Sequence, residues 1–130
     1  MDQNENGPQP GDVCVDAVGS TLMQAACLIE RGGLVKYMRH NDGAYCVHGA
    51  ISKISCGHHN NGEDFEGNSL YHEASRRMGD YLRSQGESIR RSEGYGPGRH
   101  VDDCSHWNNR PERTQAEVVA GLRAAAVFKE

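Results

Sequence analysis

Three stretches of the chain repeat apolar residues at steps of three and four, a spacing that places the side chains along one face of an α-helix. They cover residues 13–31, residues 68 or 69 to about 85, and residues 114 to about 126. The third stretch begins with Thr114-x-x-Glu117, the pattern of a capping box, in which each side chain accepts a hydrogen bond from the other residue's backbone N–H. This periodicity predicts a mainly α protein with three principal helices.

Two shorter patterns complete the expected fold. Residues 46–57 place Val47, Ile51 and Ile54 on one side of a short helix that Gly57 would end. Before it, the turn residues Asn41-Asp42-Gly43 separate two short runs that suit a small β-hairpin. We therefore expect three principal helices, a short helix and a small β-hairpin around one core.

The ends of the first helix carry their own signals. Thr21 and Gln24 match a second capping box, and Gly32-Gly33 would stop the helix. Between the second and third principal helices, the Gly-rich residues from about 84 to 100 predict a flexible loop. A brief helical turn that carries Val101, Cys104 and Trp107 would close that loop.

Composition predicts how the chain is divided. A length of 130 residues suits a single domain that buries roughly two thirds of its unfolded surface. Residues 1–11 are polar and include two prolines and two acidic residues, so we expect a disordered acidic arm there and a single α-rich domain over residues 12–130.

Location and redox state follow from what the sequence lacks. No apolar run approaches the roughly 20 residues that span a bilayer, and the first residues do not resemble a secretory signal. Five cysteines at irregular spacing suit reduced thiols better than a disulfide framework. We expect a cytoplasmic protein without membrane contact, and a host cytoplasm if a phage encodes it.

The chain contains three short motifs: Ala25-Ala26-x-Leu28-Ile29, Cys46-x-x-Gly49-Ala50-Ile51, and Trp107-Asn108-Asn109 followed by Arg113-Thr114-x-x-Glu117-Val118. In this combination the chain resembles a family of small uncharacterised domains from actinobacteria and their phages. That family has no established activity, so the resemblance implies membership of the family and an actinobacterial or phage origin, but no chemistry. It has Asp where this chain has Asn109, and Trp where this chain has Leu34. If that Asp were a catalytic carboxylate, Asn109 would mark a lost activity.

Six residues of these motifs are interpreted as structural: Cys46, Gly49, Trp107, Asn108, Thr114 and Glu117. Trp107 would plug the core, and the amide of Asn108 would bind backbone groups before the last helix. The alternative reading of this stretch is a ligand platform built on the tryptophan.

A zinc site is a second possibility, because thiols and imidazoles lie close together in Cys56-x-His58 and Cys104-x-His106. Four such groups in a tetrahedron would hold zinc or let zinc stabilise the domain. On a helix, residues two apart point some 200° away from each other, so the ligands would converge only from loops. No cofactor is otherwise expected.

A cysteine-dependent enzyme is a third possibility. Cys46 would lie where the hairpin leads into a helix, and a helix N-terminus favours the thiolate. No nucleophile motif surrounds Cys46, and tight packing of a short helix explains Cys-x-x-Gly-Ala equally well.

The partner-binding surface that we predict is an Arg-rich helix face with the loop that follows it: Arg76, Arg77, Arg83, Arg90 and Arg91. A guanidinium donates two parallel hydrogen bonds to a carboxylate or phosphate. The formal net charge of −4 disfavours nucleic acid, so the partner that we expect for these arginines is an acidic protein surface. The opposing interpretation is a solvated face in which Arg77 pairs with Asp80, and Arg83 with Glu87. We expect a small accessory or interaction protein without catalysis of its own.

Overall fold

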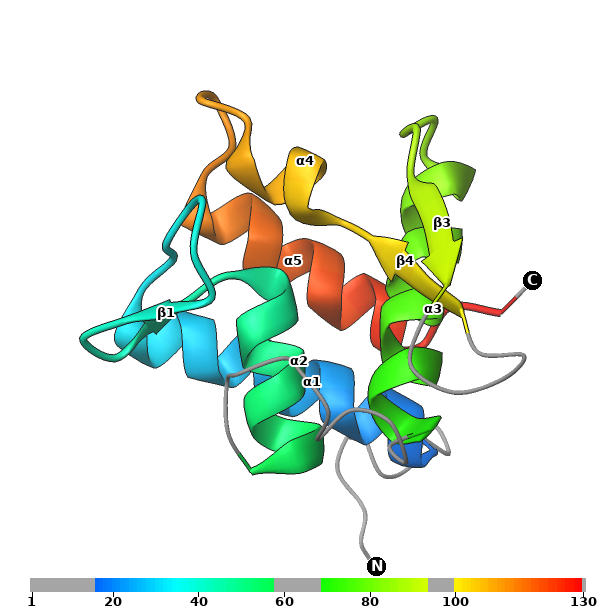
Figure 1. The fold of residues 1–130 in the computed structure, drawn as a ribbon, viewed down its shortest axis with the longest axis horizontal. Coiled ribbons are helices and arrows are strands. Elements are labelled where there is room, and N and C mark those ends of the chain that lie inside the picture. The colour runs from blue at the N-terminus through cyan, green and yellow to red at the C-terminus, as the bar shows by residue number, and fades with distance from the viewer. Residues whose placement is uncertain (1–15, 58–68, 94–99, 130) are drawn as a thin grey trace, which may run out of the picture.

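The computed structural model describes residues 16–57, 69–93 and 100–129, and its elements are arranged as Figure 1 shows. The helices are α1 (Ala17–Gly32), α2 (Val47–Cys56), α3 (Ser69–Ser84), α4 (Ser105–Asn109) and α5 (Gln115–Ala126). The strands are β1 (His40–Asn41), β2 (Ala44–Tyr45), β3 (Arg90–Glu93) and β4 (His100–Asp103). The mainly α fold with a small hairpin is confirmed.

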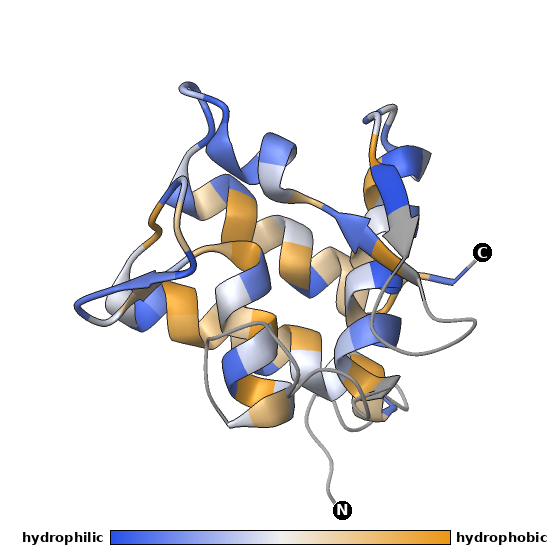
Figure 2. Ribbon diagram, viewed as in Figure 1, coloured by the Kyte–Doolittle hydropathy of each residue, from blue (hydrophilic) through white to orange (hydrophobic). Residues whose placement is uncertain are grey.

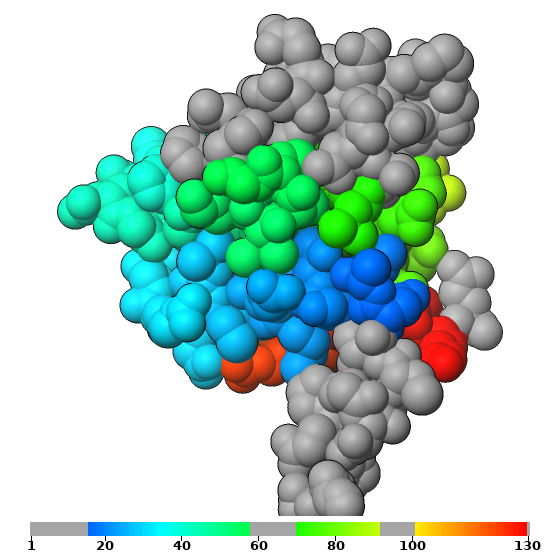
Figure 3. All heavy atoms as spheres, turned by 90° about the horizontal axis from the view of Figure 1, so that it is seen from below, coloured from blue at the N-terminus to red at the C-terminus, as the bar shows by residue number. Residues whose placement is uncertain are grey.

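The long helices bury one apolar face each against the others. In Figure 3, α1 forms a band between α2 and α3 on one side and α5 on the other, and α1 contacts all three. Apolar positions gather on the inward faces of the helices (Figure 2). The largest fully buried apolar side chains come from these four helices: Leu22, Ile29, Ile51, Met78 and Leu122. Hydrophobic burial of these stripes therefore holds the helices together.

The first helix begins before the predicted cap. Asp16 is the N-cap, because its Oδ1 accepts a hydrogen bond from the backbone N–H of Gly19 at 2.8 Å. Thr21 lies one turn inside α1, where its hydroxyl donates to the Ala17 carbonyl at 2.9 Å. The Thr21 capping box was therefore wrong, although Gly33 ends α1 with a φ of 104° as glycine-stopped helices do.

Two antiparallel hairpins are present in the described residues. In the predicted one, Asn41 pairs with Ala44, and the turn residues Asp42 and Gly43 have φ values of 53° and 89°. In the second, β3 pairs with β4, so the segment predicted as one long loop is in part a hairpin. Its strands, Arg-Arg-Ser-Glu and His-Val-Asp-Asp, lack the apolar alternation by which strands are recognised in sequence.

The second hairpin also corrects a smaller prediction. Val101 lies in β4 and only partly packs on the core, whereas α4 begins at Ser105 and carries Trp107. The predicted acidic arm over residues 1–11 lies outside the described residues. Among the helices that are described, none combines the length and apolar character needed to cross a bilayer.

Candidate functional site

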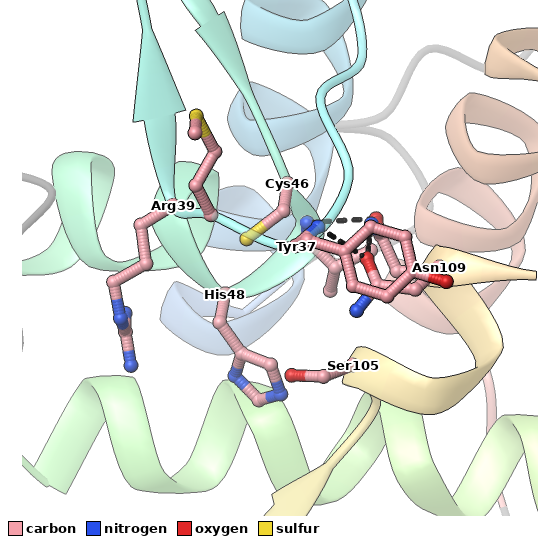
Figure 4. A pocket seen from close by; sticks show the side chains of 9 residues that line it. Tyr37, Arg39, Cys46, His48, Ser105 and Asn109 are labelled. Atoms are coloured by element: carbon pink, nitrogen blue, oxygen red, sulfur yellow. Dashed lines mark hydrogen bonds between the residues drawn. The ribbon is translucent and has the colours of Figure 1, made fainter.

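A pocket of about 310 Å³ lies where the segment before β1, the start of α2 and α4 meet (Figure 4). Nine residues line it: Tyr37, Met38, Arg39, Cys46, Val47, His48, Ser105, Asn108 and Asn109. The lining combines polar groups, among them the charged Arg39, with apolar side chains, which is the usual make-up of a ligand pocket. This pocket is the candidate site.

Asn108 ties the walls of the pocket together. Its Oδ1 accepts a hydrogen bond from the backbone N–H of Val47 at 3.1 Å, and its Nδ2 donates to the Val35 carbonyl at 3.2 Å. The same Nδ2 donates to Oδ1 of Asn109 at 3.1 Å. Because Asn108 is buried and its amide joins α4 to two other segments, its part is architectural.

Asn109 holds a strained residue in place. Its Oδ1 accepts a hydrogen bond from the backbone N–H of Tyr37 at 2.8 Å. Tyr37 has a φ of 66°, a left-handed conformation that costs a bulky residue on the order of 1 kcal/mol or more. The Tyr37 side chain is nevertheless 78% exposed, and the neighbouring Met38 is 50% exposed. The left-handed backbone of Tyr37 therefore lowers the stability of the fold, and Tyr37 and Met38 leave two large side chains exposed at the pocket.

Cys46 caps α2 and faces the pocket. Its Sγ accepts a hydrogen bond from the backbone N–H of Gly49 at 3.3 Å. Burial raises the pKa of the Cys46 thiol above its ordinary value, despite this bond and the nearby charge of Arg39. The thiol is therefore neutral near pH 7, against the depressed pKa that a nucleophilic Cys46 requires.

Gly49 is required by the packing at this point. A Cβ atom on Gly49 would lie 2.0 Å from the carbonyl oxygen of Arg39, far inside contact distance. The absence of a side chain lets Arg39, which directly precedes β1, lie on the first turn of α2, and the Arg39 carbonyl also accepts from the Cys46 N–H at 3.2 Å.

His48 forms the floor of the pocket and is held in one tautomer. Its Nε2 accepts a hydrogen bond from the backbone N–H of Cys104 at 2.9 Å, so in the neutral ring Nδ1 carries the proton and donates to the Tyr71 hydroxyl at 3.1 Å. Arg39 donates to the same hydroxyl at 3.3 Å. Burial, with the positive charge of Arg39, lowers the pKa of His48 from 6.5 to about 4. At neutral pH His48 is an uncharged structural link between α2, α3 and the start of α4.

Asp103 lies at the edge of this group. Its Oδ1 accepts from the backbone N–H of Ser105 at 2.9 Å and is 3.9 Å from Nε2 of His48. Burial opposes the charge of Asp103, but the N–H and hydroxyl of Ser105 keep the pKa of its carboxyl below the ordinary value. Asp103 therefore adds a negative charge beside His48, and Arg39 adds a positive one.

The predicted zinc ligands occupy different environments. Cys104 is fully buried, and burial raises the pKa of its thiol far above the ordinary value, whereas His106 is exposed. Cys56 is half-buried near the end of α2, and His58 lies outside the described residues. Across residues 16–57, 69–93 and 100–129, no three His, Cys, Asp or Glu side chains are grouped to hold a metal ion. The zinc hypothesis stays untested at His58.

The arginines predicted to bind a partner largely bind this chain itself. Asp102, fully buried, accepts from Nε of Arg91 at 2.7 Å and from Nη1 of Arg83 at 2.9 Å. Arg83 also pairs with Asp80 at 3.0 Å, as Arg91 does at 3.3 Å. A Cβ on Gly79 would lie 2.1 Å from Oδ2 of Asp102, so a glycine in α3 lets β4 approach. This cluster attaches the second hairpin to α3.

A second ion pair joins the two ends of the described chain. Arg77 donates to both carboxylate oxygens of Asp16 at 2.9 and 2.7 Å and to the Ala126 carbonyl at 3.3 Å. This bidentate bond lowers the pKa of Asp16 from 3.8 to about 2. Arg77 therefore does not pair with Asp80. Arg90 is exposed, so its side chain is accessible to a partner.

Trp107 and the residues around it stabilise the link to α5. The guanidinium of Arg113 lies 4.3 Å above the Trp107 ring, and its Nε donates to the Trp107 carbonyl at 3.1 Å. Glu87 pairs with Arg110 at 3.0 Å and with Arg113 at 3.9 Å, not with Arg83. The capping box forms, since Thr114 N donates to Glu117 at 2.9 Å and Glu117 N to Thr114 at 3.1 Å.

A second hollow, of about 550 Å³, lies between α1 and α5. Its two charged lining residues, Glu30 and Arg123, bind each other at 2.7 Å. The rest of its lining is Gln115 and small apolar side chains. The hollow therefore offers fewer polar groups for recognition than the pocket of Figure 4.

Sequence reasoning missed Tyr37, Met38 and Arg39 as site residues, and it singled out Asn109 only as the position where the resembled family has Asp. Cys46 and Asn108, interpreted as structural, do line the pocket as well. The available signal was the unexplained adjacency of three large side chains, Tyr37-Met38-Arg39, directly before a predicted turn.

Comparison with known proteins gives one match. A family model described as a family of unknown function (DUF6197) matches residues 14–128. No curated protein and no solved structure matches the chain.

Proposed function

Since the chain belongs to DUF6197, a family of unknown function, we propose its role from its own geometry: a small interaction protein that binds its partner through the pocket of Figure 4 and the exposed side chains of Tyr37 and Met38. The observation that carries the proposal is Tyr37. An exposed tyrosine gains nothing for folding from a φ of 66°, which glycine or asparagine adopts at lower cost. A tyrosine at this position is explained if its ring acts on something outside the chain.

The chemistry of the lining supports binding rather than catalysis. Both ring nitrogens of His48 are engaged inside the protein, and its pKa of about 4 keeps it neutral. Burial raises the pKa of the Cys46 thiol. A general base and a thiolate are what a cysteine enzyme would need here, and the geometry favours neither.

The partner that we propose is another protein. Tyr and Met are enriched at the buried centres of protein interfaces, where an amphipathic ring or a flexible thioether adapts to a complementary surface. The net charge of −4 disfavours nucleic acid, as in the sequence analysis. A cytoplasmic location and an actinobacterial or phage source remain part of the proposal and rest on the sequence patterns.

Capture of partners from source cells, with the protein as bait, tests the proposal. We expect proteins that the wild type retains to be lost with the double variant Tyr37→Ser/Met38→Ser. The matched control is Val127→Ser, which also removes an exposed apolar side chain, 50% exposed, but lies after α5. Equal retention by the double variant and the control would refute the pocket as the partner site.

A further variant tests the arginine hypothesis separately. Arg90→Glu reverses a charge in β3 that is exposed, whereas reversal at Arg77, Arg83 or Arg91 would break ion pairs that hold the fold. Loss of capture with Arg90→Glu, together with unchanged capture by the Tyr37 variant, would move the interface to the hairpin and α3.

A further inference from the structure

The orientation of the Asn109 amide is fixed by its neighbours. Two donors, the backbone N–H of Tyr37 at 2.8 Å and Nδ2 of Asn108 at 3.1 Å, point at the same side-chain atom of Asn109. That atom must therefore be the acceptor Oδ1, and the opposite atom must be the donor Nδ2. Within the part of the chain that the structure describes, this Nδ2 donates no hydrogen bond.

Three other acceptors on the pocket lining each accept a hydrogen bond from the chain itself. Oδ1 of Asn108 accepts from Val47, Nε2 of His48 accepts from Cys104, and Sγ of Cys46 accepts from Gly49. None of the nine lining residues carries a carboxylate, and Arg39 contributes a guanidinium. Figure 4 places Arg39 and Asn109 on opposite sides of the pocket, with Cys46 and His48 between them. These three acceptors are therefore engaged within the protein, whereas Nδ2 of Asn109 has no described acceptor.

We infer that the pocket binds a group with an oxygen acceptor, a carbonyl or a carboxylate, and that Nδ2 of Asn109 donates the hydrogen bond that selects it. The inference rests on the proposed function and specifies which chemical group of the partner the same pocket binds. Val47, Met38 and the ring of Tyr37 supply apolar contact for the body of the ligand. Asp103, 3.9 Å from Nε2 of His48, carries a negative charge near the pocket, and it already accepts from Ser105.

Asn109 thus has two separable parts. Its oxygen is architectural, because it fixes Tyr37, and its nitrogen is the specificity-determining group. An aspartate would keep both accepted hydrogen bonds and remove only the donor, while adding a negative charge. Asn109→Asp is therefore a variant that retains the fold and changes recognition.

The experiment measures binding of two probes by NMR, N-acetyl-leucine amide and N-acetyl-leucine, which differ in offering a neutral carbonyl or a carboxylate. The side-chain amide signal that disappears in Asn109→Asp identifies Nδ2 in the wild-type spectrum. We expect the probes to shift that signal and to bind roughly three- to tenfold more weakly to Asn109→Asp, as the loss of one hydrogen bond predicts. The control Asn41→Asp makes the same change at an exposed position in β1 and should leave binding unchanged.

The arms of the test separate the sources of the acceptor. Tighter binding of the amide identifies a peptide-type carbonyl, and tighter binding of the acid, with a larger loss in Asn109→Asp through charge repulsion, identifies a carboxylate. Equal binding by wild type and Asn109→Asp, or no shift of the Nδ2 signal with either probe, overturns the inference. If partner capture is meanwhile lost with Tyr37→Ser/Met38→Ser, the proposed function stands and this inference alone fails.

Discussion

His48 should make the stability of the protein depend on pH in a predictable way. The imidazole is 5% exposed, and its folded-state pKa is about 4 against 6.5 in the unfolded chain. Between these values the unfolded chain binds a proton that the folded chain excludes, so acidification favours unfolding. From these two values, the free energy of unfolding loses about 2 kcal/mol through His48 between pH 8 and pH 5. Arg39 strengthens the effect, and Asp102 and Asp103 oppose it.

The comparison that isolates this effect uses His48→Gln. Glutamine offers an oxygen to the Cys104 N–H but does not titrate. Urea unfolding followed by Trp107 fluorescence, at several pH values from 8 to 5, gives the stability of both proteins; Trp107 is the only tryptophan and is 5% exposed. The wild type should be the more stable at pH 8, and its advantage should shrink by about 2 kcal/mol at pH 5. An advantage that stays constant over this range would refute the buried, neutral state of His48.

Three substitutions at positions of unusual backbone or close contact give further predictions. Tyr37→Gly should change the free energy of unfolding by no more than about 1 kcal/mol, because relief of backbone strain offsets the added entropy of the unfolded chain, and it should weaken partner binding. Asp42→Gly, at a φ of 53°, is the control, and a much larger loss of stability in Tyr37→Gly would show that the Tyr37 ring supports the fold. Gly49→Ala should destabilise by roughly 1–3 kcal/mol in urea unfolding, since its Cβ would meet the Arg39 carbonyl, and an unchanged midpoint would contradict that packing. Asp102→Asn should lower the free energy of unfolding by roughly 1.5–3 kcal/mol in urea unfolding, because it weakens the ion pairs with Arg83 and Arg91. Amide hydrogen exchange in β3 should become faster, and exchange as slow as in the wild type would argue against the ion cluster.

The helices could be predicted because their signals are local. The capping box of Thr114 and Glu117 and the apolar stripes need only neighbouring residues, and burial of those stripes fixes where the helices pack. Thr21 shows the limit of such signals. Its hydroxyl matches a cap pattern, but Asp16 lies upstream at the actual helix start and Thr21 binds the preceding turn instead.

The second hairpin and the pocket depend on contacts that no local pattern records. β3 and β4 are polar strands held by Arg83 and Arg91 on one buried carboxylate, so charge replaces the apolar alternation that identifies strands. The pocket needs Asn109 beside Tyr37, 72 residues apart in the chain. The hydrogen bond from the Tyr37 backbone N–H requires only an oxygen at position 109. Asparagine can therefore hold Tyr37 at the position where the resembled family is expected to have aspartate.

Assembly of the pocket has a consequence for how the chain is made. Residues 34–37 are bound by partners that are synthesised much later: Tyr37 by Asn109, Lys36 by the Arg110 carbonyl and Leu34 by Gln115, at sequence separations of 72, 74 and 81 residues. A nascent chain emerging from the ribosome can therefore form α1 and the first hairpin early, but the pocket closes only after residues 109–115 have been synthesised. Fragments that end before α4 would contain Tyr37 without Asn109, whose side chain holds the Tyr37 backbone.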